Sequence, residues 1–237
     1  MKYWFRTAIS GALIALGLTA AASGIAADAA EPPANVTAPA DDARAALAER
    51  LNSVRTYQAS FTQQVFGARG QVLELSEGQV WLQRPQFKWV VKDPYPQVIV
   101  TDDDHLKIYD PDLEQLTVRD LDEALEDTPI SLLTRDIVEI GDRFSVTRLP
   151  EATPPGAESA QGGGGDRAAF EIRPLTDDAL YRSISLYFDT PGLVMLGILD
   201  HLGQRTEIYF SPEPATSVIE SSVFQLDVPP GTDVVGG

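Results

Sequence analysis

Residues 78–91, GQVWLQRPQFKWVV, decide the fold of this chain. Large apolar residues occupy both sides of Arg84–Pro85, and two of the chain's three tryptophans, Trp81 and Trp89, are among them. Two strand-like runs that flank a proline turn are typical of a β-hairpin. The single arginine at its corner has two possible environments, which are solvent and the inside of an apolar chamber. The choice between them bears on the function.

The same strand-and-turn pattern extends in both directions from this hairpin. Strand-like runs follow one another from Tyr57 to Asp120, with turns at residues 67–70, 84–85, 93–96, 102–104 and 110–112. Further runs occur at residues 143–149, 168–174, 181–189, 193–200, 204–211 and 223–228. Because short strands joined by tight turns pair with antiparallel neighbours, about eleven strands are predicted to form one curled antiparallel sheet. The predicted fold is mainly β, with this one sheet curled into a barrel or half-barrel and a few helices on one side.

Two regions break the strand pattern and predict helices. Residues 43–54 place apolar side chains at helical spacing, with Asp41 or Asp42 as the N-cap. Residues 121–140 fit two short helical segments. The second is predicted to begin near Pro129, with Thr128 as its cap.

An incompletely closed sheet leaves a concave face, and this chain has more large apolar residues than one small barrel can hold in its core. The combination predicts a chamber for apolar chains. The second short helix would cover this chamber as a lid. The predicted lining is Phe61, Trp81, Phe87 and Trp89 from the sheet, with Ile130, Leu132 and Leu133 from the lid.

The N-terminal residues predict export. Lys2 and Arg6 precede an apolar run and then small residues, which is the pattern of a signal peptide over residues 1–26, with cleavage as late as residue 30. A membrane anchor is the alternative, although the run is short and rich in Ala and Gly. Residues 27–42 are predicted to be a disordered lead-in and residues 43–237 one domain. Within it, residues 150–166 are predicted to form a flexible Gly/Pro-rich loop.

Charge and cysteine content exclude several classes of function. Loss of residues 1–26 would change the formal charge from −17 to −19, because this segment contains Lys2 and Arg6 and no acidic residue. So acidic a protein is predicted not to bind nucleic acid and to be repelled by an anionic membrane surface. The chain has no cysteine, which excludes disulfides, thiolate metal ligands and a lipid-modified cysteine.

The sequence contains no recognisable catalytic motif. His105 and His201 have no second histidine or cysteine at metal-ligand spacing, and Asp102–Asp104 lacks the closing glutamate of a calcium loop. No nucleophile elbow, P-loop or dinucleotide fingerprint occurs. We therefore predict no catalytic residue, metal or cofactor. Two alternatives are a binder of free fatty acids or other small apolar ligands and an envelope enzyme that acts on lipid or glycan.

Several motifs together resemble one known family. In chain order they are Y-x-A-S-F-T-Q (57–63), G-x-V-W-L-x-R-P (78–85), F-x-W (87–89), Y-D-P-D-L-E-Q (109–115), D-T-P-x-x-L-L (127–133) and F-Q-L-D-V-P-P-G-T-D-V (224–234). They are similar to the periplasmic outer-membrane lipoprotein carrier proteins, LolA, over residues 43–237 apart from the 150–166 loop. The resemblance implies an unclosed β-barrel with a helical lid over an apolar cavity that takes the acyl chains of lipoproteins.

The resemblance also implies a location and partners. The location is the periplasm of a Gram-negative bacterium. The partners are an inner-membrane ABC-type releasing complex and an outer-membrane receptor lipoprotein of the same fold. Because the receptor carries a lipid-modified cysteine and this chain has none, the chain resembles the soluble carrier. We expect it to be a monomer.

Arg84 gains a role from the same resemblance. A residue before proline is held extended, so Arg84 ends its strand with a fixed direction. Short helices leave carbonyl groups without intrahelical partners, and a guanidinium group has five donors. As in the family, Arg84 is expected to bond such carbonyls and latch the lid shut. On the residues alone, a solvated hairpin corner stays the alternative.

Overall fold

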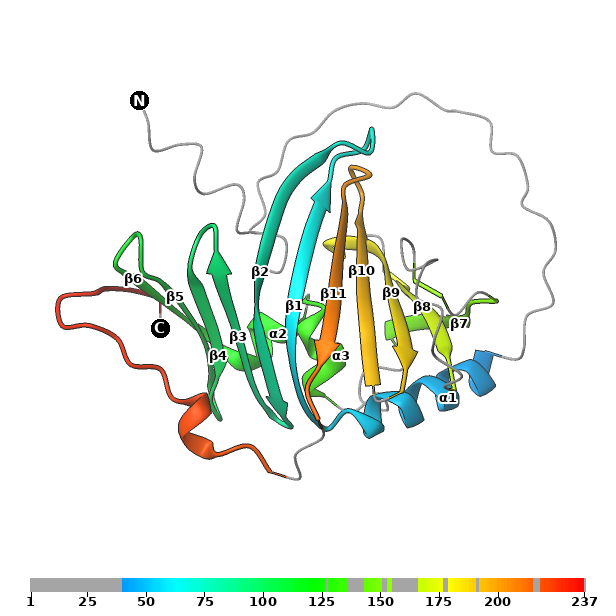
Figure 1. Cartoon of the computed structure of the whole chain (residues 1–237), viewed down its shortest axis with the longest axis horizontal. Helices are drawn as coiled ribbons and strands as arrows, with labels where there is room; N and C mark the ends of the chain where they lie inside the picture. The colour runs from blue at the N-terminus through cyan, green and yellow to red at the C-terminus, as the bar shows by residue number, and fades with distance from the viewer. Residues whose placement is uncertain are drawn as a thin grey trace.

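The computed structural model describes residues 40–126, 128–135, 143–150, 153–154, 166–176, 179–190, 192–214 and 218–236. These residues form one twelve-stranded sheet with the order β12-β6-β5-β4-β3-β2-β1-β11-β10-β9-β8-β7. Because β12 and β7 end this order, the curled sheet is unclosed (Figure 1). The prediction of a mainly β fold built on one curled sheet is therefore confirmed.

The strands are β1 (Thr56–Phe66), β2 (Val72–Gln83), β3 (Gln86–Asp93), β4 (Gln97–Thr101), β5 (His105–Asp110), β6 (Gln115–Asp120), β7 (Phe144–Arg148), β8 (Ala168–Pro174), β9 (Tyr181–Asp189), β10 (Gly192–Asp200), β11 (Arg205–Pro212) and β12 (Asp233–Gly236). The helices are α1 (Ala40–Ser53), α2 (Leu121–Glu126), α3 (Ile130–Thr134) and the 3-10 helix η3 (Ser221–Phe224). Among the described residues, no helix is long and apolar enough to cross a membrane.

Alternating burial along the strands separates a concave face from an outer face. In β1, the buried residues Ala59 and Phe61 flank the exposed residue Ser60. The β2–β3 hairpin pairs Leu82 with Phe87, and both side chains are buried in the main apolar core. Because alternate side chains point to opposite faces, the period of two in the sequence is sufficient to place these residues inside.

The helices cover the concave face. Figure 1 shows α2 and α3 behind the strands and α1 across the lower end of the sheet. α1 buries Leu47 and Leu51, one helical turn apart, in the main core. It begins at Ala40, so the prediction of a disordered lead-in over residues 27–42 is wrong at residues 40–42. Residues 27–39 of that lead-in, and most of the 150–166 loop, lie outside the described residues.

The C-terminal residues differ from the prediction in two ways. Residues 223–228, expected to be a strand, form the end of η3 and an unpaired extended segment. Lys88 Nζ donates to the carbonyl oxygens of Val223 and Gln225, at 2.7 and 2.9 Å, so an ammonium group takes acceptors that a strand would present to its neighbour. β12, which was not expected, then pairs with β6 in parallel, whereas the other strand pairs are antiparallel. The segment thus crosses the outer face and ends as an edge strand.

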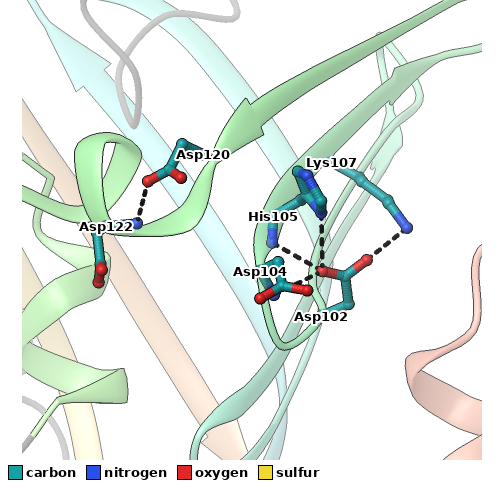
Figure 2. A network of polar contacts seen from close by, with 6 residues as sticks. All are labelled: Asp102, Asp104, His105, Lys107, Asp120 and Asp122. Carbon is teal, nitrogen blue, oxygen red and sulfur yellow. Dashed lines mark hydrogen bonds and ion pairs between the residues drawn. The ribbon is translucent and has the colours of Figure 1, made fainter. Parts of the chain in front are cut away.

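Asp120 fixes the start of α2. Its Oδ1 accepts the backbone N–H of Asp122 at 3.0 Å (Figure 2) and that of Glu123 at 3.1 Å. This is the geometry of an N-cap, in which a carboxylate satisfies N–H groups that the first turn leaves without partners. The backbone N–H of Leu121 donates to the carbonyl oxygen of Asp104 at 2.9 Å, which ties the helix to the preceding β4–β5 turn.

Asp102 organises that β4–β5 turn. Its Oδ1 accepts the N–H groups of Asp104 and His105, at 3.0 and 2.7 Å, and its Oδ2 pairs with Lys107 (Figure 2). Burial raises the pKa of Asp102, but the hydrogen bonds and the charge of Lys107 outweigh burial and lower the pKa from 3.8 to about 2. The carboxylate therefore holds the turn against which α2 begins.

This pKa gives a testable pH dependence. Because the pKa is lower in the folded state, the ionised carboxylate stabilises the folded protein above pH ~4, and this contribution is lost as the pH falls toward ~2. We expect Asp102→Asn to lower the free energy of unfolding at neutral pH, by an amount that shrinks over this acidic range. Urea unfolding at several pH values measures it. Asp103→Asn, which removes an exposed carboxylate from the same turn, is the control, and a pH-independent deficit for Asp102→Asn would contradict the assignment.

Candidate functional site

Arg84 lies at the corner of the β2–β3 hairpin and reaches two helices. Its Nε donates to the carbonyl oxygen of Leu133 in α3 at 2.6 Å. Its Nη2 donates to the carbonyl oxygen of Leu51 in α1 at 3.0 Å. The side chain is partly buried. One guanidinium group therefore joins the hairpin to α3 and to α1.

The two acceptors explain why an arginine suits this position. Leu51 and Leu133 each lie in the last turn of their helix, where carbonyl groups have no N–H partner four residues ahead. A positive charge is favourable at these carboxyl-terminal ends. The guanidinium is planar, always charged and has donors on separate nitrogens, so it can serve two carbonyls that face it from different directions. A hydrogen bond from a charged group is worth about 1.5–3 kcal/mol.

The start of α3 differs from the prediction that Thr128 caps it with its side chain. The residue that precedes the helix is Pro129, which already has helical dihedral angles and makes no side-chain cap. Thr128 contributes its carbonyl oxygen instead, which accepts the N–H and the hydroxyl of Ser131 at 3.1 and 2.8 Å. Its own Oγ1 is buried without a hydrogen-bond partner among the described residues. α3 is thus a short helix with a weakly satisfied start.

The lid and the aromatic residues of the sheet meet in one apolar cluster. Leu132 is fully buried and Leu133 is 7% exposed, and both belong to the core that contains Phe61, Phe87 and Trp89. The rings of Phe61 and Trp89 stack with their centroids 3.9 Å apart, and Phe87 and Trp89 lie 6.3 Å apart. The side chains of Leu132 and Leu133 therefore occupy the space beneath the curled sheet.

Two predicted lining residues need separate mention. The prediction for Trp81 is wrong, because Trp81 packs against a second cluster of Val100, Ile219 and Phe224, on the outer face. Its neighbours in β2, Val80 and Leu82, face the main core, so the alternation of the strand directs Trp81 outward. The second is Ile130, which begins α3 but whose side chain lies outside the described residues.

Sequence reasoning missed two residues that complete this site. Leu51 was predicted only as an apolar position of the first helix, yet its carbonyl is one of the two acceptors for Arg84. Tyr57 donates its hydroxyl to the carbonyl oxygen of Leu193 at 2.6 Å and packs edge-on against Phe210. Burial raises the pKa of the Tyr57 hydroxyl. A backbone acceptor leaves no mark in a sequence, whereas the motif at residues 57–63 contained a signal for Tyr57.

Comparison with known proteins decides the family. The model of the family described as outer membrane lipoprotein carrier protein LolA matches residues 52–227. The chain belongs to this family. It is 38% identical over 190 residues to the outer-membrane lipoprotein carrier protein of Chromohalobacter salexigens, covering 80% of this chain and 84% of that protein. The carrier protein of Hahella chejuensis is 34% identical over 191 residues, covering 80% and 86%.

Solved structures are more distant from this member of the carrier family. An uncharacterised conserved protein from Thermus thermophilus has a TM-score of 0.49 and 14% identity, covering 81% of this chain and 97% of that chain. A LolA superfamily protein from Nitrosomonas europaea has a TM-score of 0.42 and 12% identity, covering 81% and 99%.

The contacts of Arg84 predict how the lid responds to substitution. In Arg84→Leu both carbonyls lose a charged donor, so we expect the amides of residues 131–135 to exchange hydrogen at least about tenfold faster. Arg84→Lys should have a smaller effect, because an ammonium group presents its donors from one point. Hydrogen exchange by mass spectrometry measures this. The control is Arg182→Leu, an exposed arginine of β9, and equal exchange in Arg84→Leu and Arg182→Leu would mean that Arg84 does not restrain the lid.

Proposed function

We propose that this chain is a periplasmic carrier that binds the acyl chains of lipoproteins released from the inner membrane and delivers them to an outer-membrane receptor. The observation that carries the proposal is the arrangement of Arg84, which bridges the lid helix and α1 over an apolar cluster. Membership of the family and the names of the relatives support the same function. Arg84 is the proposed latch of the lid.

The geometry suggests a mechanism of exchange. In the closed form, Leu132 and Leu133 fill the space that acyl chains would use, so cargo enters only when α3 moves away. The displaced leucines are replaced by methylene groups of similar polarity, and the exchange of one apolar surface for another costs little. The hydrogen bonds that Arg84 donates to the carbonyls of Leu51 and Leu133 favour the closed form, and each is weak enough to be broken. Phe61, Phe87 and Trp89 are the proposed sheet side of the acyl chamber.

The free energy of moving acyl chains out of a bilayer explains why such a carrier needs partners. Burial of one methylene group is worth about 0.8 kcal/mol, so removal of three chains of about fifteen methylenes from a bilayer would cost about 36 kcal/mol. Non-covalent affinity saturates near about 20 kcal/mol. A carrier alone therefore cannot extract such a lipid. We propose an inner-membrane ABC-type complex as the machine that loads it and a receptor lipoprotein that unloads it.

The other features fit a carrier that works as a monomer between two membranes. Without residues 1–26 the formal charge is −19, since the charge of −17 loses the contributions of Lys2 and Arg6. This charge opposes adsorption to anionic lipid. We propose no catalytic step, and the described residues contain no cluster of acidic, histidine or cysteine side chains that could hold a metal.

Copurification separates this function from the two alternatives. A carrier isolated from the periplasm should contain a full-length acylated protein in a one-to-one complex, identified by intact mass spectrometry. Free fatty acid as the only bound molecule would favour a small-ligand binder. Turnover of a lipid or glycan, abolished by replacement of acidic residues, would favour an enzyme.

A two-step assay tests the latch during transport. Inner-membrane vesicles first load the carrier, which is then mixed with the receptor lipoprotein. We expect Arg84→Leu to load normally but to transfer little cargo, because it favours the open lid and makes the chamber more apolar. Arg84→Lys should restore transfer in part. If Arg84→Leu loads and transfers like the parent protein, Arg84 is not the latch.

Photo-crosslinking tests the position of the chamber. A photoreactive amino acid at Phe61 or Leu133 should crosslink to the acyl chains of loaded cargo, because both residues belong to the cluster beneath the lid. The same amino acid at Trp81 is the matched control, since Trp81 lies on the outer face. We expect no acyl crosslink from Trp81 or from the 150–166 loop. Crosslinks mainly from those two places would show that the chamber lies elsewhere.

A further inference from the structure

A polar pocket lies on the concave face beside the apolar cluster. It is lined by residues of β1–β4 and of the β3–β4 turn, which are Gln63, Glu74, Ser76, Trp89, Val91, Pro94, Tyr95 and Gln97. Ser76 precedes Arg84 by eight residues in the sequence, which corresponds to about 26 Å along an extended strand. The pocket and the latch therefore lie toward opposite ends of β2.

Two buried side chains of the pocket have hydrogen-bonding atoms without a partner among the described residues. They are Oγ of Ser76 and Nε1 of Trp89. Ser76 is 3% exposed and Trp89 is 2% exposed. A buried donor or acceptor without a partner destabilises the folded protein, so such atoms need an explanation. Both residues line the pocket, but the two atoms are closed to solvent in this structure, so a ligand would reach them only after the surrounding side chains shift.

Trp89 connects this pocket to the acyl chamber. One face of its ring stacks on Phe61 within the apolar cluster, while the same residue lines the polar pocket. A molecule that occupies both spaces must therefore have apolar chains joined directly to polar groups. The described acceptors and donors at this junction come from neutral side chains, apart from Glu74.

Glu74 limits which polar groups a ligand can place in this pocket. It lines the pocket, and burial raises the pKa of its carboxyl. A ligand with a carboxylate or phosphate head would place a second negative charge beside it, which is unfavourable. Neutral carbonyl groups can instead accept hydrogen bonds from the Ser76 hydroxyl and the Trp89 N–H, and an amide N–H can donate to Glu74.

We infer that this pocket is a subsite for the ester and amide groups that join the acyl chains to the N-terminal cysteine of the cargo. The inference rests on the proposed carrier function and adds a polar recognition step to it. The acyl chains extend from this subsite into the chamber beneath α3. The subsite selects acylated proteins over free fatty acids, because the fatty acid carboxylate faces Glu74.

The test compares two fluorescent probes on the full-length mature protein. The first is a synthetic triacylated cysteinyl peptide, and the second is a long alkyl chain whose fluorophore is attached without an ester or amide group. The variant is Ser76→Ala, which removes the hydroxyl group and keeps the rest of a small side chain. The matched control is Ser183→Ala, at a buried serine of β9.

We expect Ser76→Ala to weaken binding of the lipopeptide by about threefold to tenfold and to leave binding of the alkyl probe unchanged. Ser183→Ala should bind both probes like the parent protein. Equal lipopeptide binding by both variants would overturn the subsite and leave the carrier function in place. An equal loss for both probes would also overturn it, because the substitution would then disturb the chamber as a whole. A parent protein that binds neither probe would overturn the carrier function itself.

Discussion

An open, curled sheet has an apolar concave face that it cannot bury against itself, and the rest of this structure follows from that constraint. Exposure of so large an apolar surface to water would be strongly unfavourable. The chain covers it with α1 and with the short helices α2 and α3. A longer helix would make a more stable cover, but α3 has five residues and few internal hydrogen bonds. The cover is therefore held mainly by its contacts with the sheet.

Arg84 adds polar contacts to this otherwise apolar cover. Leu132 and Leu133 bury their side chains without directional preference, since apolar packing has none. The hydrogen bonds from Arg84 to the carbonyls of Leu51 and Leu133 fix where the two helices end relative to the hairpin. The hydrogen bonds define the geometry of the closed form, and the apolar packing supplies most of its contacts. Together they give a closed form of moderate stability. Such a balance is consistent with the lid movement that we propose.

The outer face is organised independently of the chamber. The C-terminal segment crosses it, with Ile219 and Phe224 packed against Val100 and Trp81. One contact of this segment lies next to the contacts of Arg84 in the sequence. The Gln83 side chain accepts the N–H of Ile219 at 2.7 Å, and the next residue, Arg84, donates to the helices on the concave face. The β2–β3 hairpin thus contacts the C-terminal segment on one face and the helical cover on the other.

The sequence by itself determined the strands, the turns and the presence of an arginine at a hairpin corner. Those features depend on local alternation and on proline, and both act within a few residues. The motifs of residues 57–63 and 78–85 likewise sufficed to indicate the family, which the comparisons confirm.

Tertiary structure decided what local patterns leave open. Trp81 faces outward because consecutive residues of a strand point to opposite faces of the sheet. The sequence of β2 has apolar residues on both faces, so it did not show which face is the concave one. In residues 223–228 the carbonyls of Val223 and Gln225 accept hydrogen bonds from Lys88, which is distant in sequence, instead of pairing with a strand. β12 pairs with the edge of β6, which is likewise distant in sequence. Two further features depend on the folded chain. Arg84 bonds a backbone carbonyl, and every residue type has one, so the sequence cannot indicate which carbonyl is used. Likewise, residue types alone do not indicate that Ser76 Oγ and Trp89 Nε1 are buried without a partner among the described residues.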